Sequence, residues 1–318
     1  MLRIRYRPSP HPRAARLGRP GPGRYTAPVE LGAVGIWGGG PWRVDDRAAE
    51  AREVAAELEQ LGFGALWISG GQQPGLSIRF RNLLDATSRM PVASGILNIW
   101  LTSPSEIARA VAELEAAHPG RFLLGLGVSH APLVERSGHS YTRPYSRMVD
   151  WLDDLDRQEP TVPADRRILA ALGPKMLALA AARSAGAHPY FVPVEHTAAA
   201  RRLLGDGPVL APEQAVVLDA DPERARRIAR QHTEGYLAAP NYTRNLRSLG
   251  FGDEDLKGAG SDRLVDAVVA WGDDAAVASR VREHHKAGAD HVCVQVLTET
   301  GDVFPRAGYR RLAEALLG

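Results

Sequence analysis

From residue 31 to its end, the chain alternates short apolar runs with longer helix-like segments, and this alternation limits its possible folds more than any other feature. The apolar runs have the length of strands, and the segments between them carry apolar residues at helical spacing. Strands joined by helices pair in parallel, so the pattern predicts a parallel sheet covered by helices. The predicted strands are residues 31–37, 63–69, 91–99, 121–128, 166–172, 187–192, 213–219 and 290–297.

Residues at the ends of the helix-like segments support this division. Ser103 and Pro104 are typical of an N-cap and a first helical position, and they predict a helix over 103–118. Asp45 or Asp46 is the expected N-cap of the helix over 45–62. Between the last two predicted strands, residues 241–286 are expected to be helical, apart from an insertion-like segment near 250–262.

Eight strand–helix units in about 290 residues predict an α/β fold of the (β/α)8 TIM-barrel type, which forms one domain over residues 29–318. A doubly wound open sheet is the alternative. A barrel also predicts where the chemistry lies, because its active site forms at the C-terminal ends of the strands and in the loops that follow them.

The first 28 residues differ from the rest in composition. They contain seven arginines, many prolines and no acidic residue, which predicts a disordered arm. We expect it to be a tail without a specific role, although such an arm could contact a phosphate-rich polymer. With a net charge of +2, the whole chain is not expected to bind nucleic acid.

We expect a cytoplasmic protein. No apolar run approaches the roughly 18 residues needed to cross a bilayer, and the first residues lack the apolar core of a secretory signal. The one cysteine, Cys293, lies in a strand-like run, where a buried core thiol is expected.

The predicted strand ends exclude several kinds of active site. None carries a His/Asp/Glu cluster at metal-ligand spacing or a Schiff-base lysine, so no metal site is expected. The run "GLGVSH" lacks the third glycine of the dinucleotide fingerprint. Several strand ends are rich in glycine, which serves a tight turn or the close approach of backbone to a ligand. Few titratable groups beside many glycines favour a protein whose cofactor carries the chemistry.

Several stretches resemble the luciferase-like monooxygenase superfamily, and within it the coenzyme F420-dependent oxidoreductases of actinobacteria. They include "PVASGILNIWLTSPSEIARAVAELEAAHPGRFLLGLGVSH" and "ILAALGPKMLALAAARSAGAHPYFVPVEH", and the similarity runs from about residue 31 to 318. The resemblance implies a TIM barrel that binds a flavin or deazaflavin at its C-terminal face, commonly as a homodimer. It also implies a non-prolyl cis peptide within Ser94-Gly95-Ile96.

The resemblance further implies which residues contact the cofactor and the substrate. Lys175 would lie at the cofactor phosphate with its neighbours, since a helix that begins at Pro174 offers free N–H groups to an anion. An exposed helix lysine is the alternative. The implied cofactor contacts are Ser94, Gly95, Ile96, Asn98, Gly127, Val128, Ser129, Gly173, Pro174, Lys175 and Met176, and the implied substrate pocket holds Trp37, Gly70, Gly71 and Trp100.

The chain departs from the family pattern after the second predicted strand. F420 enzymes that oxidise sugar phosphates carry an acid and a histidine there, whereas this chain has Gly70 and Gly71. After the fourth strand, His130 occupies the position of a carboxylate proton donor, and it is our candidate catalytic residue. A loop histidine bonded to the backbone is the alternative. His188 and His196 are expected to be structural.

The leading hypothesis is therefore an F420-dependent oxidoreductase that moves a hydride to or from a small organic substrate. An FMN-dependent monooxygenase is the alternative within the same family. A homologue that binds the cofactor without catalysis is the third possibility, and the glycines after the second strand favour it.

Overall fold

The computed structural model describes residues 29–70 and 76–318. The predicted disordered arm and Gly71 therefore lie outside the described residues. The fold is α/β: a curled, parallel sheet carries the helices on its outside, as the alternation predicted. The strands are β1 (Val34–Gly38), β2 (Leu66–Ile68), β3 (Val92–Ser94), β4 (Leu97–Asn98), β5 (Phe122–Gly127), β6 (Arg167–Leu169), β7 (Gly186–Ala187), β8 (Val209–Leu210), β9 (Glu213–Val217), β10 (Val269–Trp271) and β11 (Val292–Val296).

The strand order is β10-β9-β11-β1-β2-β3-β5-β6-β7-β8, and β4 pairs with β5. Two residues separate β8, at one end of this order, from β9 near the other end. At this junction the N–H of Ala211 donates to Ala187 O and the N–H of Glu213 donates to Pro189 O. The curled parallel sheet is thus confirmed, while a closed barrel of eight repeats stays a prediction.

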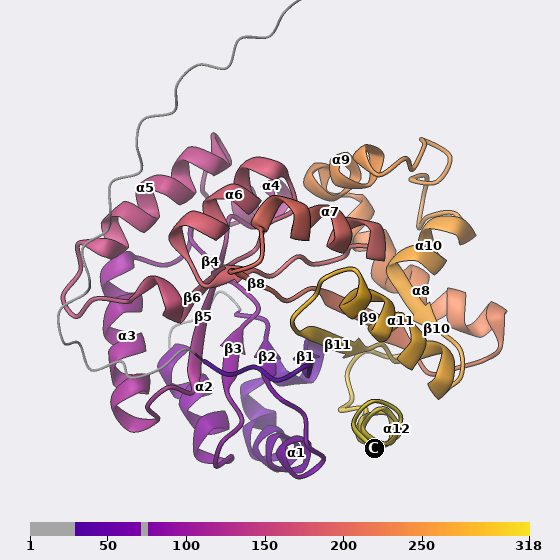
Figure 1. The fold of residues 1–318 in the computed structure, drawn as a ribbon, viewed down its shortest axis with the longest axis horizontal. Coiled ribbons are helices and arrows are strands. Elements are labelled where there is room, and N and C mark those ends of the chain that lie inside the picture. The colour runs from indigo at the N-terminus through magenta and orange to yellow at the C-terminus, as the bar shows by residue number, and fades with distance from the viewer. Residues whose placement is uncertain (1–28, 71–75) are drawn as a thin grey trace, which may run out of the picture.

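The helices pack side by side around the sheet, in the sequence α1, α2, α3, α5, α6, α7, α11 and α12. In Figure 1, α3 and α5 lie on one flank of the sheet, and α8, α9 and α10 lie on the other. The α-helices are α1 (Ala48–Gln60), α2 (Leu76–Asp85), α3 (Pro104–Ala117), α4 (Ala131–Arg136), α5 (Pro144–Asp156), α6 (Pro174–Arg183), α7 (Val194–Leu204), α8 (Pro222–Leu237), α9 (Pro240–Ser248), α10 (Asp262–Val268), α11 (Asp274–Lys286) and α12 (Arg306–Leu317). Short 3-10 helices are η1 (Gly40–Arg43), η2 (Asp45–Arg47) and η3 (Ala164–Arg166).

Capping residues start several of these helices where the sequence predicted. Ser103 caps α3 in a capping box with Glu106, and Pro104 takes its first position. The N-cap prediction for α1 is wrong. Asp45 and Asp46 lie in η2, and Arg47 is the N-cap, because a 3-10 turn comes before the α-helix.

Two other predictions need correction. Residues 241–286 were predicted to be helical apart from one insertion, but the segment also contains a strand. Val269–Trp271 form β10, which pairs with β9. The predicted strand over 91–99 is two strands, β3 and β4, because the chain breaks its pairing at Gly95 and Ile96. Helix α4, which directly follows His130, was not predicted.

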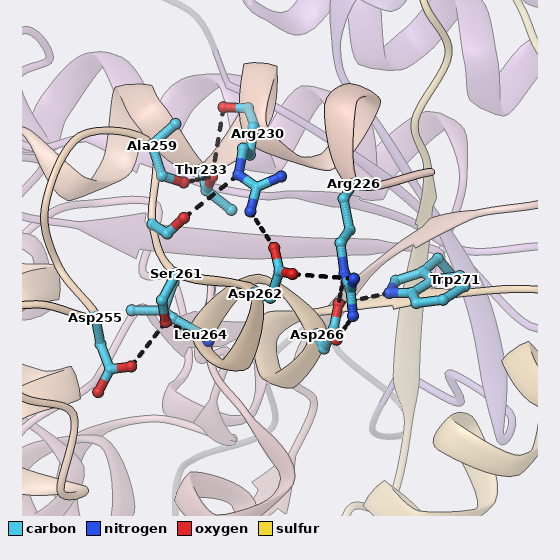
Figure 2. A network of polar contacts seen from close by, with 11 residues as sticks. Arg226, Arg230, Thr233, Asp255, Ala259, Ser261, Asp262, Leu264, Asp266 and Trp271 are labelled. Carbon is cyan, nitrogen blue, oxygen red and sulfur yellow. Dashed lines mark hydrogen bonds and ion pairs between the residues drawn. The ribbon is translucent and has the colours of Figure 1, made fainter. Parts of the chain in front are cut away.

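A polar network fixes the segment that contains α8, α9 and α10 (Figure 2). The Arg226 guanidinium donates to both oxygens of Asp266, at 3.0 and 2.5 Å, and Trp271 Nε1 donates to Asp266 Oδ1 at 2.7 Å. Asp262 forms ion pairs with Arg226 and Arg230. These contacts join α8 to α10 and β10, and α9 packs on α8. The end of α8 and the start of α9 reach the cavity described next.

Candidate active site

A cavity of about 1210 Å³ opens at the C-terminal ends of the strands, where a barrel-type enzyme is expected to carry its chemistry. Its lining comes from β1 and β4, from the loops that follow β2, β3, β5, β6 and β7, and from helices that include α8 and α9. Eleven predicted residues line it: Trp37, Gly95, Ile96, Asn98, Val128, Ser129, His130, Gly173, Pro174, Lys175 and Met176.

The backbone between β3 and β4 forms part of the cavity wall. The peptide bond between Gly95 and Ile96 is cis, as the resemblance implied. Gly127 packs beneath the Ile96 side chain, where an added Cβ would lie 2.6 Å from Ile96 Cδ1. At Gly70 an added Cβ would lie 2.5 Å from Ile96 O. At Gly70 the space that a side chain would need is therefore filled by the backbone of Ile96 and by Leu97, so neither an acid nor a histidine fits there.

Four predicted site residues support this wall from behind and are not among the residues that line the cavity. Gly70 and Gly127 pack against Ile96, as described. The Ser94 hydroxyl donates to Gly125 O and accepts from the Gly125 N–H, at 2.9 and 2.7 Å. Trp100 Nε1 donates to Val128 O at 2.9 Å. These contacts join β3 and β4 to β5.

Four buried polar atoms of cavity-lining residues have no hydrogen-bond partner among the described residues: Trp37 Nε1, Asn98 Nδ2, His188 Nε2 and Asn241 Oδ1. Trp37, Asn98 and His188 are 8%, 5% and 1% exposed. A Cβ added at Gly95 would lie 2.6 Å from Trp37 Nε1 and 3.5 Å from His188 Nε2. Unpaired buried polar groups are costly, so these atoms indicate a ligand or water that pairs with them.

The structure corrects the expectation that His188 is a satisfied core histidine. His188 Nδ1 is 2.7 Å from Ala211 O, which accepts its proton, and this leaves Nε2 as an acceptor. The ring stacks on Trp67, with ring centroids 4.4 Å apart. Burial lowers the pKa of His188 to about 4, so the ring is neutral at pH 7. His196 does not line the cavity; its Nε2 bonds to Leu172 O, while its buried Nδ1 also has no partner among the described residues. Cys293 is buried, as predicted.

The candidate catalytic residue, His130, lies half-buried at the start of α4 and lines the cavity. Ser129 before it has a φ of 57°, and its carbonyl accepts from the Tyr141 hydroxyl at 3.1 Å. The His130 ring centroid is 6.3 Å from that of Tyr242. Burial lowers the pKa of His130, and the nearby positive charge of Arg136 lowers it further.

The start of α6 gives the cavity a second polar region. Gly173 is the N-cap, and because glycine has no side chain, no side chain caps this helix. Pro174 takes the first helical position. The N–H groups of this first turn are therefore free to bind an anion, with the positive end of the helix dipole behind them. Lys175 lines the cavity beside them.

Sequence reasoning missed the aromatic and cationic residues of the cavity. Tyr190, Tyr236 and Tyr242 line it and are linked by ring contacts through Tyr236, at 5.1 Å to each neighbour. Tyr236 and Tyr242 lie in helices and not at the end of a predicted strand. The rule that a barrel carries its active site at the strand ends therefore did not predict them. The missed cations are Arg43, Arg79 and Arg244.

The described residues contain neither a metal-binding cluster nor a membrane-spanning helix. No group of three His, Cys, Asp or Glu side chains there is placed to hold a metal ion. Among the same residues, no helix combines the length and apolar character needed to cross a membrane.

Comparisons with known proteins agree with this geometry. The family model for luciferase-like monooxygenases matches residues 25–291. A search of the curated proteins found no match.

The chain also resembles solved structures. The coenzyme F420-dependent tetrahydromethanopterin reductase from Methanopyrus kandleri has a TM-score of 0.66 and 15% identity, over 92% of this chain and 99% of that one. An F420-dependent secondary alcohol dehydrogenase in complex with an F420–acetone adduct has a TM-score of 0.63 and 14% identity, over 90% and 98%. The oxygenating constituent of 3,6-diketocamphane monooxygenase from Pseudomonas putida, in complex with FMN, has a TM-score of 0.61 and 15% identity, over 90% and 96%. At these identities, the likeness shows a shared fold.

Proposed function

The chain belongs to the luciferase-like monooxygenase family, and from this premise we propose that it is an F420-dependent oxidoreductase acting on a small organic substrate. The observation that carries the proposal is the cavity itself. A space of about 1210 Å³ meets four unpartnered buried polar atoms and an open helix N-terminus, which suits a planar cofactor with a phosphate. When bound, the cofactor supplies or accepts the hydride.

The residues of the cavity would divide the binding among them. Gly95 and Ile96 would support the cofactor ring, with Val128, Ser129 and Met176 around it. Trp37 and Asn98 would donate hydrogen bonds from Nε1 and Nδ2, and His188 would accept one at Nε2. Gly173, Pro174 and Lys175 would hold the phosphate. The rest of the proposal follows the resemblance: a closed barrel, a homodimer and a cytoplasmic location.

His130 is the proposed proton-transfer residue. Its lowered pKa keeps the imidazole neutral at pH 7, so it is ready to accept a proton from the substrate rather than to donate one. In the reverse direction the same atom would return the proton. The hydride and the proton would then leave the substrate by separate routes.

A titration of the purified protein with F420 and with FMN tests the cofactor. We expect saturable changes in F420 absorbance and fluorescence, and oxidised F420 to be reduced by substrate without oxygen uptake. Saturable FMN binding with substrate-dependent oxygen consumption would instead establish the monooxygenase, a reading that the FMN-bound neighbour supports. Binding of neither cofactor would contradict both.

His130→Ala tests the proton transfer. We expect a rate of hydride transfer lower by about 10²–10⁴, the usual contribution of a positioned acid or base, with unchanged affinity for the cofactor. The wild-type rate should be constant above pH 7 and fall as the pH drops through the lowered pKa of His130, because protonation removes the acceptor.

His139→Ala is the matched control, because His139 is exposed, lies nine residues away and does not line the cavity. Equal rates for the His130→Ala and His139→Ala proteins would remove His130 from the mechanism. A wild-type rate that falls as the pH rises from 6 to 8 would show that the protonated form of His130 is the active one.

A further inference from the structure

The cavity carries an excess of positive charge. Arg43, Lys175 and Arg244 line it, and none forms an ion pair with a described residue. Arg79 also lines it, but its charge is paired with Asp45 at 2.9 Å. Of the described residues that line the cavity, none is an aspartate or a glutamate. A cavity lined by one sign of charge concentrates ligands of the opposite sign.

These cations belong to different elements, so one phosphate does not account for them all. Lys175 stands at the start of α6, where the cofactor phosphate is proposed to bind. Arg43 ends η1, which follows β1, and Arg244 lies in α9. Arg43 is exposed and has no ion-pair partner among the described residues, so it is available to bind a second anionic group.

Arg43 lines the same cavity as an aromatic wall formed by Tyr190, Tyr236 and Tyr242. Burial raises the pKa of the Tyr236 hydroxyl to about 12, and the positive charge of Arg43 opposes this rise. That hydroxyl donates to Tyr190 at 2.9 Å, and the Tyr190 hydroxyl donates to Gln295 Oε1 at 2.8 Å. Because the tyrosine hydroxyls are engaged with one another, their rings are held in place as a fixed apolar surface.

The wall continues to the unpartnered indole. The Trp37 and Tyr190 rings have centroids 5.0 Å apart, and Tyr242 packs edge-on against Tyr236. Fixed aromatic faces favour a flat, unsaturated ligand. Trp37 Nε1, buried and without a partner among the described residues, adds a donor on the same side as Arg43. Both Trp37 and Arg43 come from β1 and the turn that follows it.

We infer that the substrate is a planar, unsaturated carboxylate. Its carboxylate pairs with the Arg43 guanidinium, and its flat hydrocarbon portion packs on the Tyr236 and Tyr242 rings. The inference rests on the proposed function, because it assigns to the substrate the part of the cavity that the cofactor leaves open. An anionic extension of the cofactor is the other source of negative charge that Arg43 could meet.

Calorimetric titration of the cofactor-loaded protein with cinnamate and cinnamamide separates these sources. The two probes share their flat skeleton and differ in charge. We expect cinnamate to bind at least about tenfold more tightly, as for a charge-assisted hydrogen bond. Arg43→Gln should abolish the preference and leave the dissociation constant of the cofactor unchanged. Arg282→Gln is the matched control, since Arg282 is an exposed arginine of α11 that does not line the cavity.

Each other outcome contradicts a defined statement. Equal affinities for cinnamate and cinnamamide would overturn the substrate class while leaving the proposed function intact. A preference that survives Arg43→Gln would overturn the assignment to Arg43. Weaker cofactor binding by Arg43→Gln, with the preference retained, would assign Arg43 to the cofactor. If no cofactor loads at all, the proposed function fails first, and the inference fails with it.

Discussion

Two glycines beside the cavity matter because backbone there lies against backbone. At Gly70 an added Cβ would be 2.5 Å from Ile96 O, and at Gly125 it would overlap the Ser94 carbonyl oxygen. A backbone oxygen in a sheet cannot move aside as a flexible side chain can. Gly70 therefore has a packing role, which is a structural alternative to the view that it marks lost catalysis.

Gly70→Ala should destabilise the protein by about 1–3 kcal/mol, the usual range for overpacking a core. The added methyl group pushes on the Ile96 peptide, so the affinity for the cofactor should fall as well. Urea denaturation gives the first quantity and a cofactor titration gives the second.

Gly207→Ala is the control for this substitution. Gly207 is exposed and an added Cβ there meets no atom within 4 Å, so stability and cofactor affinity should both be unchanged. If Gly70→Ala were as stable as Gly207→Ala, the packing of Gly70 against Ile96 would not be what fixes this wall.

At the residue scale, sequence reasoning placed most of the cavity-lining strand-end residues but misjudged His188. A buried histidine in a strand-like run is usually satisfied, and the sequence cannot reveal otherwise. Only the pairing of β7 with β8 brings Ala211 to Nδ1 and so leaves Nε2 free. Contacts between residues distant in sequence decide this point.

At the scale of elements, the network around Asp266 holds the segment that supplies the tyrosine wall. Asp266→Asn should lower stability by about 1–2 kcal/mol, because it weakens hydrogen bonds from Arg226 and Trp271 to a charged acceptor. Tyr236 and Tyr242 lie in α8 and α9, close to this network, so the affinity for cinnamate should fall too. Chemical denaturation and ligand titration measure the two effects.

Asp253→Asn is the matched substitution in the same segment. The Asp253 side chain is 86% exposed in its pair with Arg247, and such surface pairs contribute little. A loss of stability equal to that of Asp266→Asn would show that the segment responds to charge in general and not to this network.

Strands and helices could be predicted where the spacing of apolar residues within a short segment identifies them. Each of the eight predicted strands overlaps an observed strand, because apolar runs bounded by turn residues are visible in the sequence. The overlap is poorest for 187–192, which shares only Ala187 with β7. Strand β10 escaped because its three residues follow α10 without a break. Strand β8 has two residues, which is too short to produce a pattern.

At the scale of the whole molecule, buried titratable groups should give stability a maximum in pH. Burial lowers the pKa of His188, His232 and His291 to about 4 and that of His284 to about 3, while burial raises the pKa of Glu213 to about 8. The histidines contribute stability above their unfolded pKa of about 6.5, and this contribution is lost as the pH falls.

Glu213 acts in the opposite direction. Its folded pKa is raised above the usual 4.5, so its contribution is complete below that value and is lost as the pH rises toward 8. Below pH 6.5 the four histidines outweigh this one carboxyl group. At pH 6.5 the histidines of the unfolded chain are still half protonated, so Glu213 alone determines the slope only above about pH 7.5. Stability should therefore be greatest near pH 7.

Urea denaturation between pH 5 and 8.5 measures this profile. Above about pH 7 the free energy of unfolding should fall with pH, by at most about 1.4 kcal/mol per pH unit, the effect of one proton. Glu213→Gln keeps the shape of the side chain but removes its titratable group. The stability of this variant should therefore not fall over this range, while the fall below pH 6.5 remains. If Glu213→Gln declined above pH 6.5 as steeply as the wild type, Glu213 would be ionised in the folded protein. The unpaired Oε1 in its buried carboxyl group would then need a partner beyond the described residues.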